Sequence, residues 1–314
     1  MFDKNTFMAK LVRSWPALPY MSLGAMLAAM YIANSGTAWL SDNEMNGGNL
    51  STLFIAASLA SGCVMFLATF RVPKAKALLE RPSVSLWAGV VSASGALLVI
   101  IIGPYYLYNY LPEQCTAVLF MVGSIVFGAG LGLIGLRNGH LYGALTPRYV
   151  IVYVGFSQLI VGATFFIVVG SPTWAPIVGG PSLAGIVVFV GMPLVAGVLA
   201  YLSRFGEQVS HSPNKATSRA SLPKSFWKLL AVVLVFSCIV SSVHASTVAT
   251  ASIEETLNGS RLVMLLRMAF ALGLIVVATG TESGGIRFGK IYSVVMVVSV
   301  GLVACLPLVS MLQT

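Results

Sequence analysis

Arg267 has the clearest capacity for binding chemistry in this sequence, because it is a charged side chain well inside an apolar stretch, RLVMLLRMAFALGL. A guanidinium carries a permanent charge and several N–H donors, so it can bind an anionic or polar ligand. At the centre of a bilayer this charge costs about 2.5–3.5 kcal/mol on insertion scales, which favours a functional role. The alternative is structural: Arg261 lies about 9 Å away along a helix, so the Arg267 side chain could extend to the membrane surface or pair with another group.

Three further polar side chains interrupt apolar stretches: Asn34, Gln158 and His244. Asn34 and His244 lie toward the outer ends of the first and seventh apolar stretches, and Gln158 lies near the middle of the fifth. Each carries a hydrogen-bonding group that could line a central ligand-binding cavity. The plain alternative is a hydrogen bond between neighbouring helices.

No pattern in the sequence supports catalysis or a metal site. It contains no paired carboxylates within apolar stretches, no serine–histidine arrangement and no metal-ligand spacing. The cysteines are scattered without a CxxC pair, which is typical of small apolar packing residues: Cys63, Cys115, Cys238 and Cys305. We therefore predict that the protein is not an enzyme and uses neither a metal nor another cofactor.

A glycine-rich segment, GAGLGLIG, lies in the fourth apolar stretch. Gly130, Gly132 and Gly135 formally match GxGxxG, but a dinucleotide site needs a preceding strand and a helix N-terminus in water. Gly128 and Gly132 form a GxxxG pair, which lets two helix backbones approach closely in lipid. We predict that these two glycines serve helix packing.

The elements that carry these residues are long apolar stretches. The chain is 57% hydrophobic and only 9% charged, whereas soluble domains are about 25% charged. A span of a bilayer takes about 20 apolar residues. The sequence therefore predicts an all-α, multi-pass transmembrane bundle in contact with the lipid bilayer, with nine spans at approximately residues 15–40, 50–70, 83–102, 116–136, 149–170, 181–202, 226–245, 261–279 and 291–311.

The charged residues predict how the chain is oriented. With a cytoplasmic N-terminus, every lysine and arginine except Arg261 and Arg267 falls in a cytoplasmic segment, as the positive-inside rule requires. Membrane topology thus accounts for the net charge of +9, and we expect no nucleic-acid binding by this segment. We predict a location in the cytoplasmic (inner) membrane, with Thr314 on the outer side.

The longest polar stretch, residues 203–228, divides the chain. We expect a six-helix membrane half at residues 1–202, a basic cytoplasmic linker at 203–225 and a partial second half of three spans at 226–314. The order of six spans, a basic loop and further spans resembles the major facilitator superfamily. The stretch FRVPKAKALLERPS keeps the basic residues of that superfamily's signature but lacks its aspartate and glycines, and GFSQLIVGATFF stands where GPxxGG is usual.

The chain is more similar to the membrane part of LuxR-type regulators, in which a facilitator-like domain precedes a helix-turn-helix. That resemblance implies a bundle around a central cavity that binds a small-molecule signal. The alternatives are a facilitator-type secondary transporter, whole or fragmentary, and a structural subunit completed by a partner chain. Residues 280–314 contain no helix-turn-helix pattern. Because three spans lack counterparts, we expect missing helices or an output domain beyond Thr314.

Overall fold

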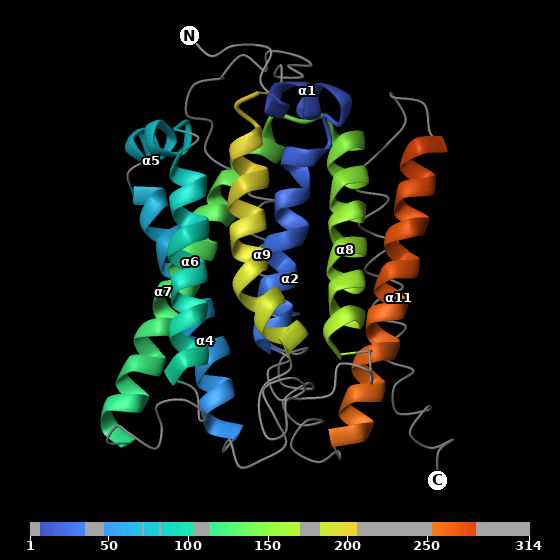
Figure 1. Cartoon of the computed structure of the whole chain (residues 1–314). Helices are drawn as coiled ribbons and strands as arrows, with labels where there is room; N and C mark the ends of the chain where they lie inside the picture. The colour runs from blue at the N-terminus through green and yellow to red at the C-terminus, as the bar shows by residue number, and fades with distance from the viewer. Residues whose placement is uncertain are drawn as a thin grey trace.

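The computed structural model describes residues 7–34, 47–70, 72–81, 83–102, 113–169, 183–205 and 253–280. Across these ranges all regular structure is helical and no strand occurs. The prediction of an all-α chain is therefore confirmed for this part of the protein. Figure 1 shows the long helices standing side by side in one bundle.

Four of the described helices are long and apolar enough to cross a membrane: α6 (Ser83–Ile102), α7 (Glu113–Gly143), α8 (Pro147–Val169) and α9 (Leu183–Leu202). α4 (Gly47–Phe70) and α11 (Ile253–Gly280) contain shorter apolar segments, Ile55–Ala68 and Val263–Val276. Large apolar side chains such as Phe66, Trp87 and Val118 face outward, where lipid would cover them. These features are those of a multi-pass membrane protein.

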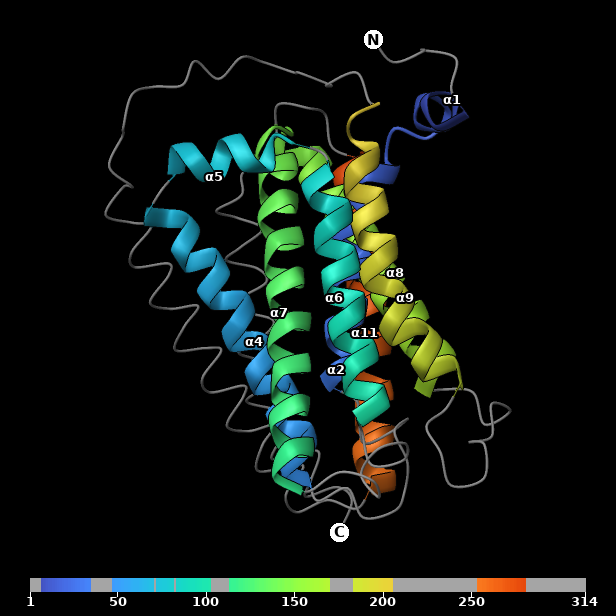
Figure 2. The same cartoon turned by 60° about the vertical axis from the view of Figure 1, so that its left-hand side comes forward.

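The helices form a continuous belt of neighbours. In spatial order they are α4, α7, α6, α9, α2 (Ser22–Asn34), α8 and α11, each packed against the next. Figure 2 shows α4, α7 and α6 along one side of the bundle. The main apolar core lies chiefly between α2, α4, α6, α7 and α9. In this core the rings of Phe127 on α7 and Phe189 on α9 pack with their centres 4.8 Å apart.

An elbow connects the first helix to the bundle. α1 (Phe7–Ser14) and the segment from Leu18 to Ala33 meet at an angle of 85°. Pro16 separates α1 from the short 3-10 helix η1 (Leu18–Met21), in which Pro19 lies. Proline lacks an N–H donor and interrupts a continuing helix. α1 consequently lies across one end of the bundle, the end at which α5 (Val72–Leu79) also lies.

Two helices extend further than the sequence predicts. α7 continues to Gly143, although the polar residues after Leu136 resemble a loop, and α11 begins at Ile253 instead of near Arg261. Of the polar residues in this extension of α7, Arg137 donates hydrogen bonds to acceptors within the protein. The predicted spans at 226–245 and 291–311, and with them the nine-span count, lie outside the described residues.

Backbones meet closely along what we call the glycine seam, formed by Gly95, Gly128, Gly130 and Gly132. A methyl group at Gly95 of α6 would overlap the α7 backbone at Phe127, and one at Gly128 of α7 would overlap the α4 backbone at Ala57. At Gly130 and Gly132 it would stand 2.7 Å and 2.9 Å from backbone carbonyls of α6 and α4, respectively. Small residues permit this approach, and helices in lipid associate through it.

Candidate ligand-binding site

The guanidinium of Arg267 lies over the ring of Tyr31, with its central carbon 4.5 Å from the ring centroid. Arg267 is on α11 and Tyr31 is on α2, and both helices pack against α8. This is a cation–π arrangement, in which the positive charge is attracted to the negative face of the aromatic ring. The structure thus gives Arg267 a partner inside the bundle.

The position of α11 is set by contacts with α8. At one end, Arg148 donates a hydrogen bond of 2.9 Å from Nη2 to the backbone carbonyl of Thr279. Further along, Gly155 and Gly162 leave room on α8 for the side chains of Ile275 and Met268. These contacts align the two helices in antiparallel register and bring the middle of α11, with Arg267, beside the bundle core.

The surroundings of this pair are apolar. Tyr31 packs against a buried cluster of Ala28, Val161, Phe165 and Met264. Arg267 itself is half-buried. Within the described ranges the only ion pair is Lys76–Glu80, so no carboxylate there neutralises the Arg267 charge. Nor does any acceptor in this part of the chain take a hydrogen bond from its guanidinium, although the group has five N–H donors.

Of the other three predicted site residues, only Gln158 has a side chain that the structure describes. Gln158 is half-buried on α8, and its side-chain oxygen is buried without a hydrogen-bond partner among the described residues. It lies between Gly155 and Gly162 in the sequence of α8, and no hydrogen bond joins its side-chain oxygen to Arg267. Asn34 is the last residue of α2, one turn beyond Tyr31, and its side chain lies outside the described part. His244 also lies outside it.

Sequence reasoning missed Tyr31. Tyrosine is common in membrane helices because its ring is apolar and its hydroxyl polar, so nothing in the stretch around residue 31 distinguishes it. A helical wheel of one span cannot reveal the pair either, because Arg267 and Tyr31 are on different helices. The signal that was visible, an arginine far inside an apolar stretch, identified one partner only.

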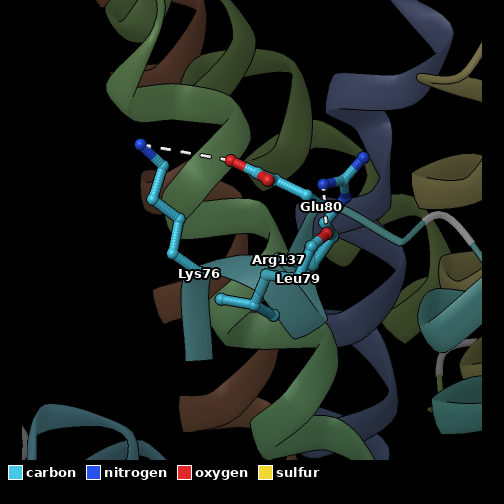
Figure 3. A network of polar contacts seen from close by, with 4 residues as sticks. All are labelled: Lys76, Leu79, Glu80 and Arg137. Atoms are coloured by element: carbon cyan, nitrogen blue, oxygen red, sulfur yellow. Dashed lines mark hydrogen bonds and ion pairs between the residues drawn. The ribbon is translucent and has the colours of Figure 1, made fainter. Parts of the chain in front are cut away.

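A second polar site lies near the end of the bundle that carries α1 and α5. Arg137 is 7% exposed; it donates from Nη1 to the backbone carbonyl of Leu79 and from Nη2 to Ser203 Oγ at 2.8 Å. Figure 3 shows its side chain beside Leu79, and Glu80 turned toward Lys76, to which it is paired at 4.0 Å. Two of the Arg137 donors are therefore engaged, and the residue connects three elements instead of presenting a free cation.

Asn138, the next residue on α7, has an unusual environment. It is 2% exposed, and neither its amide nitrogen nor its amide oxygen has a hydrogen-bond partner among the described residues. Leaving such a group buried and unpaired costs about 1–3 kcal/mol. The sequence signal for Asn138 was weak, because an Asn-Gly pair normally indicates a turn.

Aromatic residues fix the same end of the bundle. The rings of Tyr20 in η1 and Tyr153 in α8 stack with centroids 4.7 Å apart. The hydroxyl of Tyr142 in α7 donates to the backbone carbonyl of Tyr20 at 2.8 Å. These contacts join η1, α7 and α8, so they position the start of α2 relative to α8.

Within the part of the chain that the structure describes, no group of three or more His, Cys, Asp or Glu side chains could hold a metal ion. Comparison of the chain with protein-family models, with curated proteins and with solved structures finds no match. Among the described residues, the arrangement that can do binding chemistry is a half-buried cation that lies over an aromatic ring and has unused hydrogen-bond donors.

Proposed function

We propose that the protein is a membrane domain that binds an anionic small molecule beside Arg267 and Tyr31. The observation that carries this proposal is the Arg267 guanidinium, whose central carbon lies 4.5 Å from the Tyr31 ring centroid while no described carboxylate or acceptor engages the group. The group has five N–H donors, and none of them is engaged by a hydrogen bond among the described residues. A guanidinium edge matches a carboxylate or phosphate with two parallel hydrogen bonds.

The overall role that we propose is sensing, with a facilitator-like layout of six spans, a basic loop and three spans, as in the membrane part of LuxR-type regulators. The layout and the basic central stretch support this proposal, as does the lack of Asp and Glu within the apolar stretches. Proton-coupled transporters usually need titratable acids near the substrate, so their absence favours sensing over coupled transport. A facilitator-type transporter is the alternative.

The test uses the full chain in detergent micelles and a panel of small carboxylates and phosphates. A compound that binds the folded state raises the melting temperature, and the stabilisation grows as the logarithm of one plus the ratio of its free concentration to Kd. We expect Arg267→Leu to weaken binding of an active compound at least about 10-fold, because a charge-assisted bidentate contact is lost. Arg81→Gln is the matched control, since it removes an exposed arginine remote from the site.

Two outcomes would decide against parts of this proposal. Unchanged affinity in a folded Arg267→Leu variant would make Arg267 a structural residue and remove the proposed site. Uptake of the bound compound into vesicles reconstituted with the protein, absent from protein-free vesicles, would replace the sensing role by transport while leaving the site intact.

A further inference from the structure

The end of the bundle at which α1 and α5 lie carries a strong excess of positive charge. Among the described residues, six exposed cations occupy it: Lys10, Arg13, Lys74, Lys76, Arg81 and Arg204. The only acid described there is Glu80, which lies 4.0 Å from Lys76. A surface with this charge complements an anionic one.

α1 has the composition of a helix that lies at a membrane surface. At 100° per residue, Lys10 and Arg13 fall on one side of the helix, Met8, Leu11 and Val12 fall on the other, and Phe7 lies at the boundary beside Lys10. Phe7 is 75% exposed and Trp15, just after the helix, is 65% exposed. Exposed rings next to lysine and arginine are characteristic of helices that rest between lipid headgroups and acyl chains.

The elbow gives α1 the orientation that such a contact requires. It turns α1 by 85° from the segment that contains α2. Because α2 runs with the spanning helices, α1 must run nearly parallel to the membrane plane. Val12 is buried, and Figure 2 shows the helix projecting outward beyond α9, away from the other helices. Its exposed rings are thus carried over the lipid that surrounds the protein.

From these observations we infer that α1 is an interfacial helix whose Lys10 and Arg13 bind the headgroups of anionic phospholipids, with Phe7 and Trp15 inserted at the level of the upper acyl chains. Basic side chains near a leaflet attract anionic lipids through charge, and the aromatic rings determine the depth. This lipid site is separate from the Arg267–Tyr31 pair and does not depend on any small-molecule ligand.

The test measures which lipid lies next to Trp15. The full chain is reconstituted in nanodiscs of equimolar phosphatidylcholine and phosphatidylglycerol, with brominated acyl chains on only one of the two lipids. Bromine quenches tryptophan fluorescence at short range. The emission of Trp15 is obtained as the difference between the wild-type protein and Trp15→Phe, because the chain has 5 tryptophans.

We expect brominated phosphatidylglycerol to quench Trp15 at least about two-fold more strongly than brominated phosphatidylcholine, because the cations Lys10 and Arg13 closely precede Trp15 in the sequence and attract anionic lipid. In the double variant Lys10→Gln with Arg13→Gln, the two brominated lipids should quench Trp15 equally. In the charge-conserving double variant Lys10→Arg with Arg13→Lys, brominated phosphatidylglycerol should remain the stronger quencher. No quenching by either lipid would put α1 in water and overturn the inference. Equal quenching in the wild-type protein, or a preference that survives the double glutamine change, would overturn the headgroup assignment.

Discussion

Arg137 on α7 donates a hydrogen bond of 2.8 Å to Ser203, which follows the last residue of α9. The same guanidinium donates to the carbonyl of Leu79 at the end of α5. One buried side chain therefore ties together three elements that are far apart in the sequence. Its polar contacts also explain how α7 continues past Leu136 through residues that resemble a loop.

We expect Arg137→Leu to lower the free energy of unfolding by about 1–3 kcal/mol, because it leaves the Leu79 carbonyl without its buried donor. Ser203→Ala should also cost about 1–3 kcal/mol, since it removes two hydrogen bonds: the one that Arg137 donates to Ser203 Oγ and the one that Ser203 Oγ donates to the Ala200 carbonyl at 2.7 Å. Unfolding in mixed micelles at increasing denaturing detergent measures both. Arg81→Gln is the control, because a change of an exposed arginine should stay within about 0.5 kcal/mol. An equally small effect of Arg137→Leu would mean that its two hydrogen bonds do not stabilise the contact between these elements.

The glycine seam predicts that alanine substitutions at two glycines of α7 have sharply different effects on the stability of the protein. Gly128→Ala should destabilise the protein by about 1–3 kcal/mol, because the added methyl overlaps the α4 backbone and forces the helices apart. Gly139→Ala should be neutral or stabilising by up to about 1 kcal/mol, since nothing lies within 4 Å of the new methyl and alanine favours the helix. Melting temperatures of the two variants in the same detergent test this; equal values would argue against close packing at Gly128.

Asn138 allows a test of how much a buried amide without hydrogen bonds costs the stability of the protein. We expect Asn138→Leu to raise the free energy of unfolding by about 1–3 kcal/mol, because it removes an amide that is buried without partners among the described residues. Thermal unfolding followed by circular dichroism measures the change. Ser92→Ala is the comparison: its hydroxyl donates to the Phe127 carbonyl at 2.9 Å, so its loss should destabilise. A destabilised Asn138→Leu variant would mean that the amide is hydrogen-bonded in solution.

The orientation predicted from charge can be tested with reporter fusions. In Figure 1, α9 ends at the end of the bundle that carries α1, and α11 begins at the opposite end. A fusion after Lys228 should report cytoplasm and a fusion after Glu255 should report the exterior, because the basic central stretch stays inside. A fusion after Arg204 should agree with the one after Lys228. The same side for Lys228 and Glu255 would show that the predicted topology is wrong.

Much of the described fold follows from apolar length alone. The stretches predicted near 83–102, 149–170 and 181–202 correspond to α6, α8 and α9, which span Ser83–Ile102, Pro147–Val169 and Leu183–Leu202. This agreement has a simple cause: a segment that must cross hydrocarbon needs a minimum apolar length and satisfies its backbone hydrogen bonds as a helix. The GxxxG spacing of Gly128 and Gly132 likewise indicated a packing face, because spacing within one helix is visible in sequence.

The site could be predicted only in part, because a pair across two helices is a tertiary feature. The cost of burying a charge drew attention to Arg267, but its partner Tyr31 is separated from it by most of the chain. The same limit applies to Arg137, whose position in a polar stretch suggested a loop until its acceptors on α5 and beyond α9 were known. The elbow before α2 was also not predicted, although Pro16 and Pro19 marked the place.

Some glycines in the helix contacts face the main chain of a neighbouring helix and others face a side chain, and this implies that some helix pairs can shift more easily than others. At Gly95 and Gly130 the nearest opposing atoms include main chain, whereas at Gly155 and Gly162 the nearest opposing atoms belong to the side chains of Ile275 and Met268. Main-chain surfaces in contact cannot adjust without moving whole helices, but a methionine can change rotamer. We therefore expect α4, α6 and α7 to behave as a rigid body, and any displacement caused by a molecule bound at Arg267 to be absorbed where α11 slides on α8.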